Sequence, residues 1–320
     1  MRLTLPDLPP VALADLPRAH HYGEFYGLKP LPEDDRFLVV HGNCQAEALR
    51  LLVQDAPKAP CASVRMPPVH ELTAEEVPLL QRLLLRASVV LTQPVTDGYH
   101  DLPLGMAQVA AAAPDATVDV WPVIRYAGLL PWQVVFNHPR AGDPPVVPYH
   151  DVRTMLRAAG EPEPRTGDAE FRAVSAWSLH ELGERERRAG AVPVSDLVRE
   201  AGPSATNTVN HPGNGVLVAM ARRLQGHLGW PVTAADPGFT LLDSVHAPVD
   251  PVVLEALGLA DAPSDAASRE AKGDWVVDGE RVPAEHIATA QIAWYHQNPD
   301  VLHDVLMRSA NQRRLLSREP

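Results

Sequence analysis

Short apolar runs alternate with amphipathic segments along the first 125 residues of the chain. The runs at 36–40, 61–66, 88–93 and 117–124 are apolar and rich in β-branched residues, which is typical of buried strands. The segments between them, at about 45–55, 73–87 and 102–114, consist of helix formers with apolar positions at helical spacing. This β-α-β-α order predicts a parallel sheet with helices on both faces, which is a three-layer α/β fold.

The remainder of the chain predicts helical additions to this sheet. We expect a mostly helical stretch at 140–200, a polar loop near 261–285 and a last helix around 285–312. The apolar faces of two predicted helices are Phe171, Val174, Ser178 and Leu182, and Val216, Met220 and Leu224. We therefore expect an N-terminal arm at 1–35, a main α/β domain at 36–260 and a C-terminal loop and helix at 261–320.

Composition narrows the class of protein. The net charge of −12 argues against nucleic acid or an anionic membrane as the main partner. No apolar run reaches the ~20 residues that a membrane helix needs, and the N-terminus lacks the apolar core of a signal peptide. With two cysteines in 320 residues, a disulfide scaffold is not expected. These features predict a cytoplasmic protein without membrane insertion.

Cys44 occupies an informative position, in the stretch "VVHGNCQAEALRLLV" at 39–53. It lies where a predicted strand turns into a predicted helix. Ligands of parallel sheets bind where the carboxyl end of a strand leads into a helix, and a helix N-terminus favours the thiolate form of a cysteine. Gly42 gives the turn conformational freedom. Cys44 is therefore a candidate nucleophile, with a small buried side chain as the alternative, whereas we expect Cys61 to be inert.

His211 is the candidate base for such a nucleophile. It precedes Pro212 and Gly213 directly before a predicted helix, which presents the imidazole from a loop at a helix start. An exposed loop histidine is the alternative. The other histidines show no spacing that suggests a metal site, and neither a Gly-x-Gly-x-x-Gly nor a P-loop pattern occurs.

These two motifs carry a resemblance to known enzymes. Gly42-Asn43-Cys44 followed by His211-Pro212-Gly213-Asn214 is similar to the serine turn and the histidine segment of SGNH hydrolases, with cysteine in place of serine. The Gly-Asn-Cys-Gln turn resembles the WcbI-type polysaccharide-biosynthesis acetyltransferases more closely. "SVVLTQPVTDGYHDLPLG", "NHPGNGVLVAMA" and Tyr126-x-Gly128-x-x-Pro131 also fit that family. The resemblance covers roughly residues 36–260.

The resemblance implies an SGNH-like fold of flavodoxin-like topology. It also implies an O-acyltransferase that moves an acetyl group from acetyl-CoA to a sugar hydroxyl. Cys44 and His211 would be catalytic, with no metal. Gly42, Asn43, Gln45, Gln93 and Asn210 are the candidate oxyanion or substrate residues. For Gln93 a structural amide, for Asn43 a turn-shaping role and for Gln45 a solvent-facing side chain remain open. Arg65, Arg125 and Tyr126 are candidate CoA-binding residues, and surface arginines are the alternative for the first two.

One departure from the hydrolase pattern bears on the reaction. Thr208 stands three residues before His211, where SGNH hydrolases have an aspartate. A threonine does not stabilise an imidazolium as a carboxylate does, which suits a cysteine enzyme and leaves Asn207 or Asn210 to orient the ring. Two other functions remain open: a cysteine-dependent esterase or thioesterase, and a non-catalytic glycan- or nucleotide-binding protein.

Overall fold

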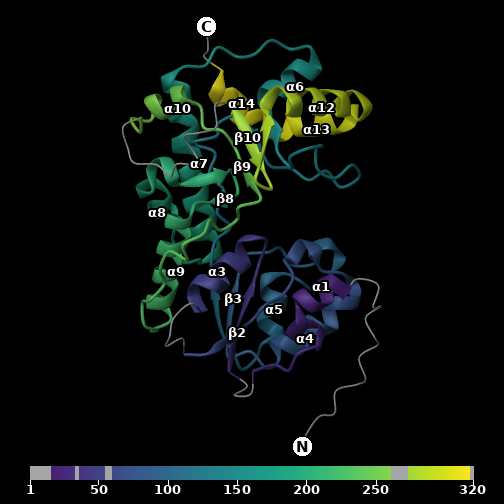
Figure 1. Cartoon of the computed structure of the whole chain (residues 1–320), viewed down its shortest axis with the longest axis vertical. Coiled ribbons are helices and arrows are strands. Elements are labelled where there is room, and N and C mark those ends of the chain that lie inside the picture. The colour runs from purple at the N-terminus through teal and green to yellow at the C-terminus, as the bar shows by residue number, and fades with distance from the viewer. Residues whose placement is uncertain (1–15, 33–35, 55–59, 261–272, 318–320) are drawn as a thin grey trace, which may run out of the picture. The chain divides into compact units, whose positions relative to one another are not determined.

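The computed structural model describes residues 16–32, 36–54, 60–260 and 273–317 of the chain. They form two compact units, whose elements are labelled in Figure 1. The first unit takes its described residues from Met1–Val123, Arg188–Val192 and Ala221–Ala235, and the second takes them from Ile124–Arg187, Pro193–Met220 and Asp236–Pro320. The functional segments expected at 1–35, 36–260 and 261–320 stay a prediction.

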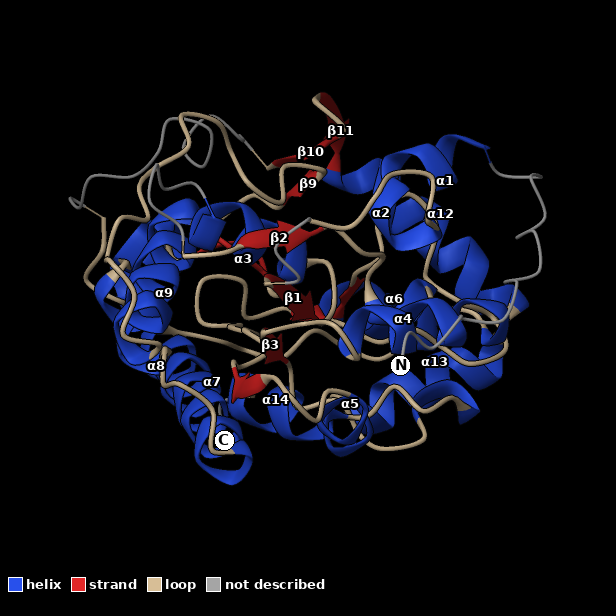
Figure 2. Ribbon diagram, turned by 90° about the horizontal axis from the view of Figure 1, so that it is seen from below, coloured by secondary structure: helices blue, strands red, loops and turns tan. Residues whose placement is uncertain are grey.

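Within the described residues, the first unit is built on a four-stranded parallel sheet, which confirms the predicted α/β fold. The strand order is β2-β1-β3-β4, and Figure 2 shows β1 between β2 and β3. This is the order in which a flavodoxin-like sheet begins. The strands are β1 (Phe37–His41), β2 (Ala62–Val64), β3 (Val89–Thr92) and β4 (Thr117–Val120).

Helices cover both faces of this sheet and complete the three layers. The connection through α3 (Gln45–Gln54) crosses the sheet in one direction, and those through α4 (Val77–Leu84) and α5 (Met106–Ala112) cross it in the other. Right-handed crossovers therefore place α3 on one face and α4 and α5 on the opposite face, as in Figure 1. Gln225 of α9 (Asn214–His227) donates to the Val53 carbonyl on α3, so the end of α9 joins the α3 layer.

The central strand β1 is buried along its whole length. Phe37 and Val39 pack with Val90 of β3 against the leucines of α4. Successive strand residues point to opposite faces, so Leu38 and Val40 face α3. The apolar run that predicted this strand is thus explained by burial on both faces.

Part of the predicted N-terminal arm belongs to this core. Two short helices, α1 (Leu16–His21) and α2 (Gly23–Tyr26), form within it. Phe25 is fully buried against the cluster that contains α4, and Arg18 donates to Glu71 at 2.5 Å. The rest of the expected arm, residues 1–15 and 33–35, lies outside the described residues.

The predicted capping box at Thr73 and Glu76 is confirmed, with the Thr73 amide donating to Glu76 Oε2 at 2.9 Å. It caps a short 3₁₀ turn, Ala74–Glu76, and α4 begins only at Val77. Further 3₁₀ turns in this unit are Val69–Glu71 and Tyr99–Asp101.

The second unit combines helices with small antiparallel sheets. β5 (Gln133–Val134) pairs with β6 (His150–Asp151), β7 (Thr206–Thr208) pairs with β8 (His211–Pro212), and β9 (Val245–His246) pairs with β10 (Asp274–Val277), which also pairs with β11 (Glu280–Pro283). Its helices are α6 (Val152–Ala159), α7 (Asp168–Ala189), α8 (Ser195–Glu200), a 3₁₀ turn (Gly202–Ser204), the first half of α9, α10 (Pro251–Ala256), α12 (Ala284–Gln297), α13 (Pro299–Arg308) and α14 (Ala310–Leu316). The predicted helical additions are therefore present.

The two helices predicted from their apolar faces are confirmed as α7 and α9. All four residues predicted on the face of α7 are buried, as are the three predicted on α9. Residues of α9 up to Met220 belong to the second unit, and those from Ala221 belong to the first.

Two expectations for the C-terminal part are wrong. The region expected to be a polar loop at 261–285 contains the hairpin of β10 and β11, which turns at Asp278-Gly279; residues 261–272 lie outside the described residues. The last helix, expected unbroken over 285–312, is three helices. Pro299 has no amide hydrogen to donate to the preceding turn, so a new helix begins there.

No helix among the described residues is long and apolar enough to span a membrane.

Candidate active site

The turn between β1 and α3 displays Cys44 at the N-terminus of a ten-residue helix. The side chain of Asn43 caps this helix, because its Oδ1 accepts from the Gln45 amide at 3.0 Å and its carbonyl accepts from the Ala46 amide at 2.9 Å. Asn43 therefore shapes the turn. Cys44 is half-buried, and Gln45 is fully buried rather than facing solvent.

Position 42 requires glycine because there is no room for a side chain. Its backbone conformation does not require glycine, because its φ is not positive. A Cβ at this position would lie 2.6 Å from Oε1 of Gln93 and 2.9 Å from Cζ2 of Trp121. Side chains essentially never approach so closely. The turn thus brings the ends of three strands together: Gly42 after β1, Gln93 after β3 and Trp121 after β4.

A hydrogen bond to its side-chain oxygen holds Gln93 against the turn. Its Oε1 accepts from the Asn43 amide at 2.8 Å, and its side chain is 1% exposed. Its Nε2 is buried and makes no hydrogen bond within the described part of the chain. An unpaired buried donor costs about 1–3 kcal/mol, so this amide is held ready for an acceptor that the described residues do not supply.

Trp121 offers a second donor of the same kind, which the sequence analysis missed. It is fully buried, and its indole Nε1 makes no hydrogen bond to the described residues. Its place in the second half of the fourth predicted strand, 117–124, was the signal that could have identified it, because ligands bind at the carboxyl ends of parallel strands.

His41 also lies at this end of the sheet, but its side chain is on the face that α4 covers. Its Nδ1 contacts the Thr92 hydroxyl at 2.9 Å, and the residue is fully buried among the side chains on the α4 face. Burial lowers the pKa of His41 to about 4, so the imidazole is neutral at neutral pH.

Arg65, a predicted CoA-binding residue, directly follows β2, and its side chain reaches the first turn of α3. Its Nε lies 3.0 Å from Oε1 of Glu47, and its guanidinium lies 5.7 Å from the centre of the Tyr22 ring. Its side chain is 35% exposed, so it remains accessible to a ligand while its position is set by Glu47.

His211 lies in β8 of the second unit, where it is 8% exposed. Its ring meets the ring of Tyr149 edge-on, with 6.4 Å between the centres. Burial is the main reason that its pKa is lowered to about 4; the charge of His246 adds to this, and hydrogen bonds to the backbone of Leu242 and Val245 oppose it. The imidazole is therefore neutral at neutral pH and able to accept a proton.

Thr208, which replaces the hydrolase aspartate, is engaged elsewhere. Its hydroxyl lies 2.8 Å from the Tyr149 hydroxyl and donates to Oδ1 of Asn210 at 3.3 Å. Asn210 is thus tied to Thr208. Its predicted contact with substrate remains a prediction.

Tyr126 and Arg125 also belong to the second unit. Tyr126 is buried, with its hydroxyl 2.9 Å from that of Ser175, and its ring leaves no room for a Cβ on Gly128. The Tyr-x-Gly pattern therefore has a packing role. Arg125 is exposed, and its carbonyl accepts from Arg185 at 3.4 Å.

The structure thus brings Gly42, Asn43, Cys44, Gln45 and Gln93 together in the first unit and places His211, Asn210, Tyr126 and Arg125 in the second. The predicted proximity of Cys44 and His211 stays a prediction. No group of three or more histidine, cysteine, aspartate or glutamate side chains able to hold a metal occurs among the described residues.

Comparison with known proteins identifies the family and the fold. Residues 37–233 match the family described as polysaccharide biosynthesis enzyme WcbI. The fold is similar to a solved structure of WcbI, called a novel polysaccharide biosynthesis enzyme and described as the native protein without a disulfide bond between coenzyme A and one of its cysteines. That similarity has a TM-score of 0.67 at 18% sequence identity and covers 88% of this chain and 96% of the other.

No curated protein matches the chain in sequence. The family match spans well over half of the 320 residues and includes the whole Gly42–Gln45 turn, Gln93 and His211. The chain belongs to the WcbI family of polysaccharide biosynthesis enzymes.

Proposed function

We propose that the protein is a CoA-dependent O-acyltransferase that acetylates a carbohydrate hydroxyl. The observation that carries this proposal is the buried Gln93 amide, whose unpaired Nε2 is held against the turn of Cys44 at a helix N-terminus. The family is one of polysaccharide biosynthesis, and the solved relative is described together with coenzyme A and a cysteine. Both support a thioester donor and a sugar acceptor.

In the first step Cys44 acts as the nucleophile. Its thiolate attacks the carbonyl carbon of the acetyl thioester, so that a bond forms to Cys44 Sγ and the CoA thiolate leaves. The positive end of α3 stabilises negative charge on Sγ before the attack. The acetyl group is then held as a thioester of Cys44.

Gln93 and Trp121 supply hydrogen-bond donors for the oxygen that becomes negative in this step. Both donors are buried and unpaired among the described residues, and both side chains touch Gly42, two residues before Cys44. Donors fixed before the reaction stabilise an oxyanion without a cost of reorganisation. The backbone N–H of Asn43 is not available for this purpose because it donates to the side-chain oxygen of Gln93.

In the second step His211 removes the proton from the acceptor hydroxyl as its oxygen attacks the acetyl-cysteine. The Cys44 thiolate then leaves, and the O-acetyl sugar is formed. The imidazole of His211 is neutral, which is the form that accepts a proton, and its pKa of about 4 makes it a weak base until a bound acceptor changes its surroundings. This step requires His211 to reach Cys44 in the working enzyme.

Arg65 is the residue we propose for the CoA phosphates in the first unit, because it is accessible and lies near the first turn of α3. Arg125 is exposed and keeps the same proposed role from the second unit, whereas the buried hydroxyl of Tyr126 is already paired. Reduced cysteines and a CoA donor both favour the cytoplasm as the site of the reaction.

Mass spectrometry of the protein incubated with acetyl-CoA alone tests the covalent step. The wild type and a Cys61→Ser control should gain one acetyl group on the peptide that contains Cys44, and Cys44→Ala should gain none. A Cys44→Ala protein that acetylates an acceptor at the wild-type rate would refute covalent catalysis. Acetate release without acceptor, as fast as transfer, would identify a hydrolase instead.

Gln93→Met tests the oxyanion donor. We expect kcat to fall about 10²-fold to 10³-fold while the rise in Tm caused by CoA is retained, because the donor acts mainly on the transition state. The matched control is Gln81→Met, on the exposed side of α4. An unchanged kcat in Gln93→Met would contradict the assignment of the donor.

A further inference from the structure

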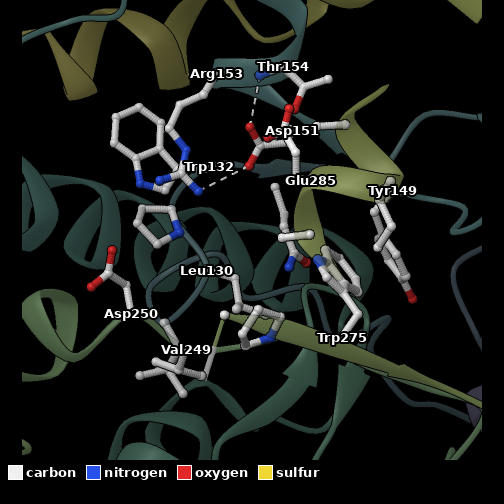
Figure 3. A pocket seen from close by; sticks show the side chains of 18 of the residues that line it. Leu130, Trp132, Tyr149, Asp151, Arg153, Thr154, Val249, Asp250, Trp275 and Glu285 are labelled. Carbon is white, nitrogen blue, oxygen red and sulfur yellow. Dashed lines mark hydrogen bonds and ion pairs between the residues drawn. The ribbon is translucent and has the colours of Figure 1, made fainter. Parts of the chain in front are cut away.

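The second unit contains a cavity of about 840 Å³ that the proposed chemistry of Cys44 does not use. Its walls come mainly from the segment that leads into β5, from β6 and α6, from the segment that leads into α10, and from β10 and α12. The volume lies within the range of about 300–1,000 Å³ that is common for small-molecule sites. Figure 3 shows the side chains that converge on it.

Aromatic faces form part of the lining. Trp275 is 8% exposed and stacks on Tyr149, with 5.8 Å between the ring centres and 27° between the planes. Trp132 is 9% exposed and lies under the guanidinium of Arg153 at 5.0 Å (Figure 3). Such rings offer flat apolar surfaces that pack well against the C–H faces of a sugar.

Gln133 provides a buried polar group that has no partner among the described residues. Its side chain is 5% exposed and lines the cavity, and its Oε1 makes no hydrogen bond to any described residue. A carbonyl oxygen only accepts hydrogen bonds, so the group that it lacks is an O–H or N–H donor. Hydroxyl groups of a bound molecule would supply it.

The charges of the lining disfavour a polyphosphate. Each arginine is already paired: Arg153 with Asp151 at 3.5 Å, drawn in Figure 3, and Arg157 with Glu285 at 3.0 Å. Among the described lining residues, two arginines face four carboxylates, a net charge of −2. These groups are Arg153 and Arg157, and Asp151, Glu163, Asp250 and Glu285. An anion such as CoA would meet excess negative charge here, whereas a neutral molecule with many hydroxyls would meet acceptors and fixed donors.

We infer that this cavity binds a neutral sugar, with its apolar face on Trp275 or Trp132 and a hydroxyl donating to Oε1 of Gln133. The inference rests on the proposed function in one respect: the sugar is then the acceptor of the acetyl group. The binding itself needs neither CoA nor Cys44.

Saturation-transfer NMR measures this binding without the reaction. The probes are the methyl glycosides of glucose, galactose, mannose and rhamnose, each at millimolar concentration with the full chain and no CoA. We expect at least one glycoside to receive saturation, and we expect Gln133→Met and Trp275→Leu each to reduce that signal at least five-fold. Trp177→Leu is the matched control, because Trp177 is a half-buried residue of α7 outside the cavity lining.

Gln133→Met also separates binding from folding. Removing a buried acceptor that has no partner in the described part of the chain should leave Tm unchanged or raise it, so a lost signal in this variant reports on the ligand. Cys44→Ala should bind the same glycoside as strongly as the wild type, whatever becomes of the proposed acyl transfer. No signal from any glycoside, or a signal that survives both cavity variants, would overturn the inference. Loss of stabilisation by CoA in Gln133→Met, with glycoside signals unchanged, would assign the cavity to the donor and overturn it too.

Discussion

Replacing Gly42 by alanine tests the convergence of three strand ends on the turn of Cys44. The new Cβ would lie 2.6 Å from Oε1 and 2.8 Å from Cδ of Gln93, and 2.9 Å from Cζ2 of Trp121. Neither side chain can give way into solvent, because they are 1% and 0% exposed. Gly42→Ala therefore forces the Gln93 amide away from the backbone amide of Asn43.

The expected cost follows from these two effects. Forcing a methyl group into a packed site costs about 1–3 kcal/mol, and losing the hydrogen bond from Asn43 to Gln93 costs about 0.5–1.5 kcal/mol. We expect the free energy of unfolding to fall by about 1.5–4.5 kcal/mol in total.

Urea unfolding, followed by circular dichroism and tryptophan fluorescence, measures this loss. Gly215→Ala is the control: it lies in α9, has no atom within 4 Å of its would-be Cβ, and should gain about 0.5–1 kcal/mol. In a Gln93→Ala background the cost of Gly42→Ala should shrink by at least about 1 kcal/mol, because the side chain that obstructs the new Cβ is shortened. A Gly42→Ala protein as stable as the wild type would refute the packing described for this turn.

Three further predictions follow from the site. Iodoacetamide should label Cys44 faster than Cys61, because α3 favours the thiolate of Cys44 whereas burial raises the pKa of the Cys61 thiol; equal slow labelling of both, measured by mass spectrometry, would contradict this. The pKa values of His41 and His211 are lowered from 6.5 to about 4, so the unfolded chain binds more protons between these values, and stability should fall as the pH drops from 6.5 to 4, by roughly 3 kcal/mol for each residue. Urea midpoints across this range measure the fall, and His41→Asn should lose its share; a flat profile would contradict the neutral buried rings. His211→Ala should stop transfer to the sugar but retain acetylation of Cys44 by acetyl-CoA, and loss of both at once would assign His211 to the first step.

Local sequence patterns were sufficient for most elements of the first unit. The apolar run at 36–40, the helix formers after Gln45 and the capping box at Thr73 all report interactions within a few residues, so periodicity and propensity predict them without the fold. The Gly-Asn-Cys-Gln turn and the His-Pro helix start were visible for the same reason. The hairpin at 274–283 was missed although its Asp278-Gly279 turn is a local signal for it, as Pro299 is for the break in the last helix.

Only the tertiary structure decided which side chains meet at the sheet end. Three residues that follow different strands and are far apart in the chain meet there: Gly42, Gln93 and Trp121. The side chains of Gln93 and Trp121 approach Gly42 closely, and no periodicity in the sequence encodes this approach. The unpaired donors of Gln93 and Trp121 and the unpaired acceptor of Gln133 were likewise invisible, because a missing partner is a property of everything packed around an atom. The neutral state of His211 depends on burial, which many distant segments produce together. The sequence by itself therefore determined the elements of the first unit and the position of Cys44 at a helix N-terminus, and the packing of distant segments determined the buried donors, the proton affinities and the cavity.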